Sequence, residues 1–379
     1  MYKGIRPGRE PMTDTSDKTL RADRKPSPEP GEDIHLLVAI DGAMEGERIE
    51  VGGDKLVLGR SSKADVRISD AQVSSTHCVV RVRDGEIRVT DVGSTNGTFV
   101  DGERVAPTGS VALGSVLEIG EHVFRHERRT RREFEREERF QEDLRRAREY
   151  VLGLIPEPLL TDAFELDWVF LPSAVLGGDL LGYHVLEDGR CALYVLDVCD
   201  HGPQSALHSA AALHAVRNPT ESRLADPSLL FERLNETFAM ETHGGLYFTA
   251  WYGVYDPRTR RLEYASAGHP PALLQAPEGG ALTSLATKNP PIGALGRRSF
   301  AKAVIDVPAG AKLYVFSDGV YEITDDLGKD GSYADFETLV AEPSVDGQGE
   351  PERLLQAVRN ARGKQRFEDD FSLLVATLL

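Results

Sequence analysis

The hydrophobic and polar positions of the chain follow two patterns, which predict two folded regions. In residues 34–126, short apolar runs alternate with turn signals, and the pairs Asp84-Gly85 and Asp101-Gly102 each stand between two strand-like segments. Asp-Gly pairs between apolar runs are typical of antiparallel hairpins. No window of this region has a convincing helical period, so the region is predicted to be an all-β sandwich.

Residues 157–379 combine apolar strands with helical segments. The alanine-rich residues 204–217 predict one helix, and the start signal Asp-Pro-Ser at 226–228 predicts a second over residues 227–242. A hairpin is predicted to turn at residues 256–259, between two apolar runs. Strands that cluster with helices set between them favour an α+β fold over a doubly wound parallel sheet.

Residues 127–156 connect these regions and are predicted to form a highly charged helix, because arginine and acidic residues are nearly balanced in them. Apolar residues recur with the spacing 4, 3, 4, 3 at Phe140, Leu144, Ala147, Val151 and Leu154. This is a heptad pattern that lasts only about two repeats. Two interpretations stay open: the seam packs on its own domain, or it joins two copies of the chain as a homodimer.

Length, charge and composition limit the classes of protein to which the chain can belong. Its 379 residues favour two domains, and its net charge of −17 argues against a nucleic-acid-binding protein. Its three cysteines form no CxxC pair, so neither a disulfide framework nor a zinc site is predicted. No apolar run approaches the ~20 residues that span a bilayer, and the polar N-terminus is no signal peptide. We expect a cytoplasmic protein that does not contact a membrane.

The proline-rich first residues lack apolar periodicity and predict a disordered tail. The predicted organisation is therefore a tail over residues 1–33, a β domain over 34–126, a linker helix over 127–156 and an α+β domain over 157–379.

Acidic residues stand at the ends of the most apolar strands of the second region. Asp179 follows a glycine pair, and the run CALYVLD, launched by an Asp188-Gly189 turn, ends at Asp197. Asp318 follows the strand KLYVF, and the Asp369-Asp370 pair precedes the closing strand FSLLVATLL. Because a carboxylate next to a buried strand is costly unless a partner neutralises it, these acids predict a site for a hard metal ion.

The loops of the β region carry three motifs in a recognisable order: LGR at 58–60, SSTH at 74–77 and DVGSTNGTFVDG at 91–102. Together they resemble the forkhead-associated (FHA) domain, which reads phosphothreonine peptides. The resemblance implies that Arg60 and Ser74 contact the phosphate, since a guanidinium and a hydroxyl donate hydrogen bonds to its oxygens.

The same resemblance assigns the other residues of the peptide-binding loops. Thr95 and Asn96 are expected to hold the peptide backbone, and His77 to brace the loops from within. Ser75 occupies a further position of the expected phosphopeptide site, where many FHA domains have arginine, lysine or asparagine. This departure weakens the expected phosphate cradle and concerns affinity rather than fold.

The second region carries six ordered motifs: GGD, DVCDHG, YFTAWYGVYDP, YASAGHPP, YVFSDGVYE and DDFSLLV. They resemble the PPM family of metal-dependent serine/threonine phosphatases, and within it the bacterial branch typified by the sporulation phosphatase SpoIIE. The resemblance implies a multidomain chain in which an FHA sandwich and a helical linker precede an α+β PPM fold, a central β-sandwich flanked by helices.

The PPM resemblance also implies a site of two Mn²⁺ or Mg²⁺ ions, which prefer oxygen ligands. The family's metal-binding acids fall on Asp179, Asp197, Asp318 and Asp369, with the Val198 carbonyl as a further ligand. Asp197 is expected to bridge the two ions, and Asp197 with Asp179 to be central to catalysis. The implied reaction is the hydrolysis of phosphoserine or phosphothreonine by metal-activated water.

One motif departs from the commoner family text DVSGHG, because Cys199 and Asp200 replace serine and glycine. The proton donor to the leaving group stays open, with His201 as one candidate. Cys199 is disfavoured as a nucleophile because the sequence offers no basic partner that would lower its pKa.

The expected partners are phosphorylated proteins, among them an anti-sigma-factor antagonist or a Ser/Thr kinase and its substrates. Two other interpretations remain: an FHA phosphopeptide-binding scaffold fused to an inactive phosphatase-like domain, and an active phosphatase whose FHA module no longer binds. The presence of all four aspartates favours an enzyme over a scaffold.

Overall fold

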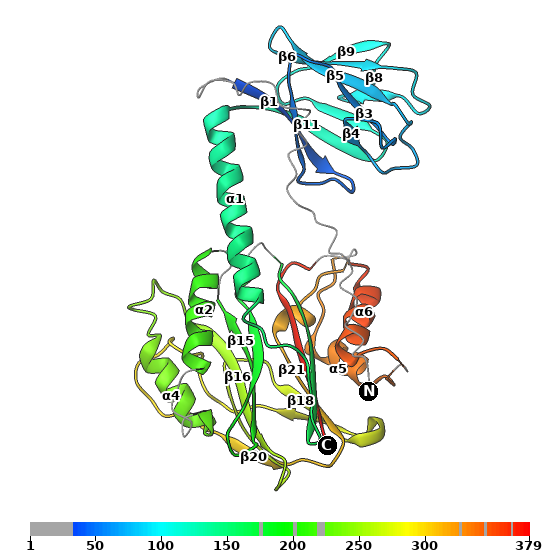
Figure 1. Cartoon of the computed structure of the whole chain (residues 1–379). Helices are drawn as coiled ribbons and strands as arrows, with labels where there is room; N and C mark the ends of the chain where they lie inside the picture. Colours follow the sequence, from blue (N-terminus) through cyan, green and yellow to red (C-terminus); the bar gives the residue numbers. More distant parts are fainter. Residues whose placement is uncertain are drawn as a thin grey trace. The chain divides into compact units, whose positions relative to one another are not determined.

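The computed structural model of the chain describes residues 33–173, 177–199, 203–217, 224–325, 328–344, 347–364 and 367–379. The predicted tail, apart from Asp33, lies outside the described residues, as do Asp200 and His201. The chain forms two compact units, Met1–Gln141 and Glu142–Leu379. Figure 1 shows the elements of each.

The first unit is a sandwich of two β-sheets, which confirms the predicted all-β fold. One sheet has the order β2-β1-β11-β10-β7-β8, with bounds Arg48–Val51, Asp33–Asp41, His122–Thr130, Val116–Ile119, Thr98–Val100 and Glu103–Arg104. The other has the order β4-β3-β5-β6-β9, with bounds Val66–Arg67, Leu56–Gly59, Cys78–Arg83, Glu86–Asp91 and Thr108–Val111. Buried aliphatic side chains and Phe124 fill the space between them.

Both predicted Asp-Gly hairpins of this unit are present. Asp84 and Gly85 join β5 to β6, and Asp101 and Gly102 join β7 to β8. All four residues have positive φ, 54°, 76°, 51° and 79° in that order. Two successive positive φ angles define the type I′ turn, whose twist matches that of the flanking strands.

Helix α1 spans Arg131–Leu152, four residues later than its predicted start at residue 127. Residues 127–130 instead extend β11, where they pair with the start of β1. Thr130 then caps the helix: its hydroxyl accepts from the Glu133 backbone N–H at 3.2 Å, and the Glu133 carboxylate accepts from the Thr130 backbone N–H at 3.1 Å. This reciprocal pair satisfies two donors that a helix start leaves free.

The second unit is built on two antiparallel sheets. A five-stranded sheet has the order β14-β15-β16-β17-β20, with bounds Leu180–Val185, Cys191–Val198, Phe248–Asp256, Arg261–Ala267 and Ala303–Asp306. A six-stranded sheet has the order β12-β13-β22-β21-β18-β19, with bounds Leu159–Leu160, Phe164–Leu171, Phe371–Leu378, Ala311–Phe316, Ala272–Gln275 and Leu282–Leu285.

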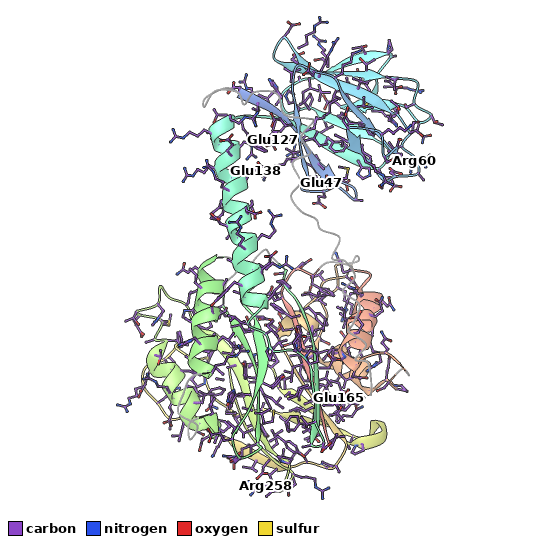
Figure 2. All side chains as sticks on the ribbon, viewed as in Figure 1. Glu47, Arg60, Glu127, Glu138, Glu165 and Arg258 are labelled. Atoms are coloured by element: carbon purple, nitrogen blue, oxygen red, sulfur yellow. The ribbon has the colours of Figure 1, made fainter. Side chains whose placement is uncertain are left out.

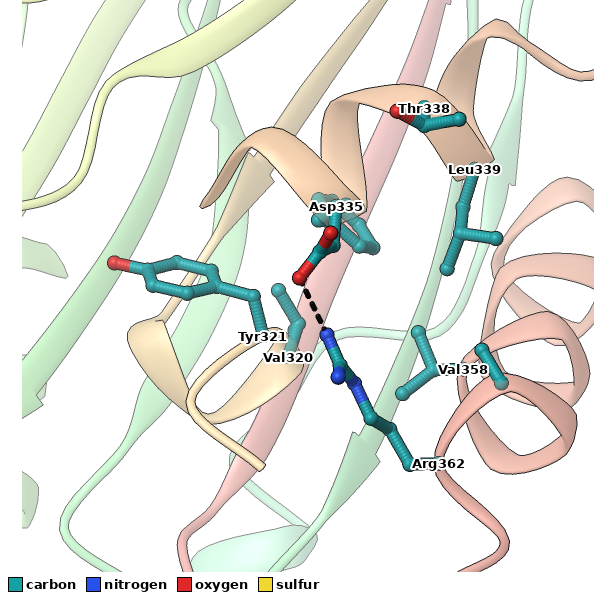
Figure 3. Close-up of a pocket in the computed structure, with 9 residues that line it drawn as sticks. Val320, Tyr321, Asp335, Thr338, Leu339, Val358 and Arg362 are labelled. Carbon is teal, nitrogen blue, oxygen red and sulfur yellow. Dashed lines mark hydrogen bonds and ion pairs between the residues drawn. The ribbon is translucent and has the colours of Figure 1, made fainter. Parts of the chain in front are cut away.

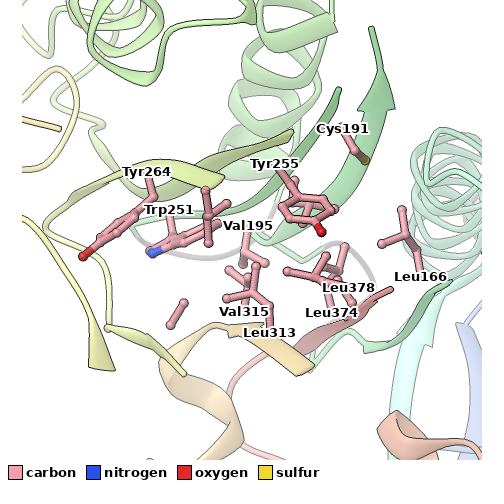
Figure 4. Packing of buried hydrophobic residues seen from close by; sticks show 14 of the residues in the cluster. Leu166, Cys191, Val195, Trp251, Tyr255, Tyr264, Leu313, Val315, Leu374 and Leu378 are labelled. Atoms are coloured by element: carbon pink, nitrogen blue, oxygen red, sulfur yellow. The ribbon is translucent and has the colours of Figure 1, made fainter. Parts of the chain in front are cut away.

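The two sheets pack face to face, and helices cover their outer faces. Alternate residues of β15 show why: Leu193 and Val195 point between the sheets, whereas Tyr194 and Leu196 point to the outer face. Figure 4 shows the inner cluster, in which Val195 lies among side chains of both sheets. This arrangement confirms the predicted α+β fold with a central sandwich.

Helices α2 (Pro203–Arg217) and α4 (Pro227–Thr237) pack on the five-stranded sheet. Helices α5 (Tyr333–Ala341) and α6 (Glu350–Arg362) pack on the six-stranded sheet. The predicted end of the second helix at residue 242 is wrong, because the chain leaves the helix at Phe238 and turns through residues 239–245. Its predicted start is confirmed, since Asp226 caps it by accepting from Ser228.

The apolar seam of the linker helix divides between two environments. Val151 and Leu154 are partly buried against the core of the second unit, whereas Phe140 is 51% exposed. Within the ranges that the structure describes, no helix is long and apolar enough to cross a membrane.

Candidate functional site

The four predicted metal-binding acids lie at one end of the two packed sheets of the second unit. Asp179 immediately precedes β14, and Asp197 is the penultimate residue of β15, its neighbour in the five-stranded sheet. In the six-stranded sheet, Asp318 begins the short helix η2 (Asp318–Val320) just after β21, and Asp369 stands two residues before β22. Paired strands therefore bring one acid pair to the edge of each sheet.

Strand parity decides which side chains face the gap between the sheets. Leu181, Val195 and Leu374 point into the inner core. Since side chains alternate along a strand, positions 179, 197 and 372 lie on the same inner face. The Ser372 hydroxyl donates a hydrogen bond of 2.6 Å to the Asp179 carboxylate, which ties the two sheets together beside the acids.

Asp370 organises the segment around Asp179 from the opposite sheet. Its carboxylate accepts hydrogen bonds from the Ser173 backbone N–H at 2.7 Å, the Ser173 hydroxyl at 3.0 Å and the Asp179 backbone N–H at 3.1 Å. Its side chain also packs against Gly177, where an added Cβ would lie 2.2 Å from a carboxylate oxygen. Asp370 thus holds the glycine-rich segment that positions Asp179.

The carboxylates are close enough to shift one another's ionisation. Burial, followed by the charges of Asp318 and Asp369, raises the pKa of Asp197 to about 7. Burial, and then the Asp369 carboxylate, raise the pKa of Asp318 to about 6. Burial followed by the charges of Asp197 and Asp370 raises the pKa of Asp179 well above its ordinary value. The site therefore concentrates negative charge that a cation would stabilise.

The donor set fits a hard divalent cation, because carboxylate and carbonyl oxygens are the ligands that Mg²⁺ and Mn²⁺ prefer. In the conformation described, no three His, Cys, Asp or Glu side chains of the described ranges converge closely enough to coordinate one ion. The acids are gathered within electrostatic reach, at the ends of strands from two sheets.

Val198 and Cys199 follow Asp197 at the end of β15. Val198 is buried, and Cys199 joins the neighbouring segment through its backbone N–H, which donates to the Tyr247 carbonyl at 3.1 Å. The Cys199 thiol accepts a contact from the Tyr247 backbone N–H at 3.3 Å. Cys199 therefore has a structural role in the described conformation.

The sequence alone named Asp370 only as the neighbour of Asp369, and it did not identify Ser372 or Ser173. A signal existed for Ser372, because it follows Asp370 with the period of a strand inside an otherwise apolar run. Ser173 gave no signal, because only the tertiary fold brings it to Asp370.

In the first unit, the three predicted loops converge at one edge of the sandwich. Arg60 is exposed directly after β3 (Figure 2). The Ser74 hydroxyl accepts from the Thr95 backbone N–H at 3.0 Å, and the Asn96 amide donates to the Gln72 carbonyl at 2.8 Å. Ser75 is exposed, and its carbonyl accepts from the Ser61 backbone N–H at 3.1 Å. The structure thus brings all five predicted residues together.

His77 fastens these loops from inside, as expected. Its side chain is fully buried; Nδ1 accepts from the Ser74 backbone N–H at 3.1 Å, and Nε2 donates to the Gly97 carbonyl at 3.0 Å. Asp91, which sequence analysis passed over, shapes the third loop by accepting from the backbone of Gly93 and Ser94 at 2.8 Å each. Burial opposes ionisation of Asp91, but these and other hydrogen bonds hold its pKa below its usual value.

A separate cavity of about 260 Å³ lies between η2, α5 and α6 (Figure 3). An ion pair of 2.7 Å between Asp335 and Arg362 lies in its wall. The cavity contains none of the predicted site residues, although its lining residue Val320 follows Asp318 by two positions. It is distinct from the acid cluster.

Comparison with known families identifies both units. Residues 187–379, a little more than half of the chain, match the family described as Stage II sporulation protein E (SpoIIE). The chain belongs to the SpoIIE family. Residues 56–120 match the FHA domain, so an FHA domain precedes a SpoIIE-type domain of the PPM phosphatase class.

Individual relatives match one domain each. Phosphoserine phosphatase RsbP of Bacillus subtilis is 29% identical over 185 residues, which cover 48% of this chain and 46% of RsbP. FHA domain-containing protein FhaB of Mycolicibacterium smegmatis is 34% identical over 87 residues, 23% of this chain and 56% of FhaB. The chain thus spans about half the length of the curated relatives it matches.

A solved structure supports the fold of the SpoIIE-type domain. The SiaA-PP2C domain of Pseudomonas aeruginosa matches with a TM-score of 0.53 and 18% identity, covering 64% of this chain and 98% of that domain. At this identity the likeness concerns the fold alone.

Proposed function

We propose that the chain is a metal-dependent protein serine/threonine phosphatase that its FHA domain directs to phosphothreonine-bearing partners. The observation that carries the proposal is the gathering of Asp197, Asp318 and Asp369 from two sheets, close enough that the charge of Asp369 raises the pKa of both Asp197 and Asp318. Neutralising cations would stabilise such a cluster at neutral pH.

Asp179, Asp197, Asp318 and Asp369, with the Val198 carbonyl, would hold two Mn²⁺ or Mg²⁺ ions. When bound, such ions activate water and offset the charge of a phosphoryl group. The chain's own residues orient the acids: Ser372 holds the Asp179 carboxylate at 2.6 Å, and Asp370 holds the backbone before it. The charges of Asp318 and Asp369 in the other sheet act on Asp197, which is why we propose that Asp197 would be the ligand shared by the two ions.

Release of inorganic phosphate from a phosphoserine protein in Mn²⁺ tests the proposal. We expect turnover that EDTA abolishes and that Asp197→Asn lowers by at least a thousandfold. A matched control is Asp306→Asn, because the Asp306 side chain is 94% exposed on strand β20. If the native chain binds phosphothreonine peptide but releases no phosphate, the scaffold interpretation replaces this one.

The FHA domain would bind phosphothreonine through Arg60, Ser74 and Ser75, with Thr95 and Asn96 on the peptide backbone. The existing contacts of Ser74 with Thr95 preorganise this surface. We expect Arg60→Ala to abolish binding of a phosphothreonine peptide, whereas Arg83→Ala, at the far end of β5, should leave binding unchanged. Unmeasurable binding by the native chain would instead favour an FHA module that no longer binds, consistent with Ser75.

The substrates we propose are phosphoproteins such as an anti-sigma-factor antagonist, or proteins phosphorylated by a Ser/Thr kinase. We also propose a homodimer through helix α1, supported by the exposed Phe140 on its seam. Sedimentation of the native chain and of Phe140→Asp tests this: a dimer that the substitution dissociates supports it, and a native monomer contradicts it.

A further inference from the structure

The segment Gly268-His269-Pro270-Pro271 is the crossover between the two sheets of the SpoIIE-type domain. It leaves β17 of the five-stranded sheet at Ala267 and enters β18 of the six-stranded sheet at Ala272. It crosses at the end of the sandwich where the acids lie. On one side, Gly268 forms a β-bridge with Ala250; on the other, Leu273 pairs with Tyr314, four residues before Asp318.

The backbone of this crossover has little freedom. Gly268 has φ of +66°, and an added Cβ would lie 2.6 Å from Pro291. Its N–H donates to the Asn289 carbonyl at 3.1 Å. The two prolines that follow His269 each fix φ near −65°. The imidazole of His269 is therefore delivered to a defined place between the sheets.

His269 contacts the strand that neighbours Asp197. Its Nδ1 lies 2.7 Å from the Thr249 hydroxyl. Thr249 and Asp197 are directly opposed cross-strand partners, and both share the parity of residues that point between the sheets, as Trp251 and Val195 do. Directly opposed side chains on one face of a sheet are in contact range.

The other ring nitrogen faces the second sheet. Nε2 of His269 is fully buried without a hydrogen-bond partner among the described residues, and the ring interacts with the backbone of Phe316, two residues before Asp318. Burial lowers the pKa of His269 to about 3, and Phe316 only partly offsets this effect. The ring is thus neutral at physiological pH. A neutral ring that carries its proton on Nε2 can accept from the Thr249 hydroxyl at Nδ1.

We propose that His269 is a positioning residue that sets the separation between the sheet edges carrying Asp197 and Asp318, through Thr249 on one side and the Phe316 backbone on the other. This inference rests on the proposed metal-dependent function. On the opposite side of the cluster, the bond from Ser372 to Asp179 ties the same two sheets. The acids therefore lie between two contacts that join the sheets, the His269 contact with Thr249 and the Ser372 hydrogen bond to Asp179.

The alternative is that His269 only stabilises the crossover, and metal affinity separates the two roles. Residues that orient the ligands of a metal change its affinity by about 10- to 100-fold, whereas a purely structural residue changes the stability of the fold without changing affinity. The test is calorimetric titration of the full chain with Mn²⁺ alone at pH 7.5. The variants are His269→Phe, which keeps a ring without polar atoms, and the matched pair Thr249→Val and Thr249→Ser.

We expect His269→Phe and Thr249→Val each to weaken Mn²⁺ binding by about tenfold or more, and Thr249→Ser, which keeps the hydroxyl, to bind as the native chain does. The double variant His269→Phe/Thr249→Val should bind no worse than His269→Phe, because both remove one tie. In phosphate-release assays at saturating Mn²⁺, both variants should reach a kcat closer to the native value than their apparent Mn²⁺ affinity is to the native affinity.

Affinities within twofold of native for both His269→Phe and Thr249→Val overturn the inference while leaving the proposed function standing. A native chain that neither binds Mn²⁺ nor releases phosphate overturns both. If His269→Phe does not fold, the Thr249 pair decides alone, since valine and threonine have nearly the same shape: equal affinity of Thr249→Val and Thr249→Ser contradicts the proposal.

Discussion

Asp370 and its neighbour Asp369 are adjacent acids with opposite environments. Asp370 is 4% exposed and accepts three hydrogen bonds from Ser173 and Asp179, whereas Asp369 is exposed. We expect Asp370→Ala to lower the free energy of unfolding by about 3 kcal/mol, because it removes the acceptor of three hydrogen bonds, one of them from the buried Asp179 N–H.

Asp369→Ala is the matched control and should cost less than about 1 kcal/mol of stability without metal, because an exposed acid beside other acids contributes little. Urea unfolding in EDTA compares them. Equal losses in the two variants would show that Asp370 does not organise the segment.

The raised pKa of Asp197 makes a prediction about pH. A carboxyl whose folded pKa, about 7, exceeds its ordinary value of 3.8 favours the folded state only while protonated. Its contribution to stability is therefore full below pH 4 and is lost as pH rises toward 7. In EDTA, Asp197→Asn should be more stable than the native chain at pH 8, and the difference should vanish near pH 4.

Urea unfolding at both pH values measures this difference. Addition of Mn²⁺ at pH 8 should reverse the order, since only the native chain binds the ion tightly. A difference independent of pH would contradict the assigned environment of Asp197.

At the scale of elements, the linker helix shows what a sequence pattern can and cannot decide. The heptad pattern selected Phe140, but Phe134 is the buried aromatic: it is fully enclosed with Ile34 and Leu36 of β1. The pattern could not reveal this, because the partner strand lies about a hundred residues earlier in the chain. The same limit explains the shifted start of α1, which depends on pairing between β11 and β1.

Two phenylalanines in one helix supply a matched test. Phe134→Ala should destabilise the first unit by about 3 kcal/mol, because it empties a buried site. Phe140→Ala, at a position 51% exposed, should change stability by less than about 0.5 kcal/mol. Thermal unfolding of the two variants distinguishes the sites, and comparable shifts in Tm would contradict the packing described for α1.

For the whole molecule, the order of motifs was enough to predict both domains and the sandwich of the second, because turn chemistry and strand parity are local signals. The acids at strand ends could also be predicted, since an acid bordering an apolar run is visible in the sequence. Contacts between side chains of distant strands could not be predicted. Ser372 and Asp179, for example, are 193 residues apart in the sequence.

The two compact units predict separable activities. Arg60→Ala should abolish phosphopeptide binding while leaving Mn²⁺-dependent hydrolysis of p-nitrophenyl phosphate within twofold of native. Asp197→Asn should have the reverse effect. Binding and hydrolysis measured on both variants check this, and loss of both activities in either variant would show that the units depend on each other.

We propose that carboxylates from two sheets hold divalent cations. Anomalous scattering from crystals of the full chain grown in Mn²⁺ can test this proposal. We expect two peaks about 3.5–4 Å apart, both within coordination distance of Asp197, with Asp318 and Asp369 on one of them. If the native protein shows Mn²⁺-dependent turnover but its crystals show no anomalous peak at these acids, the proposed metal site is contradicted.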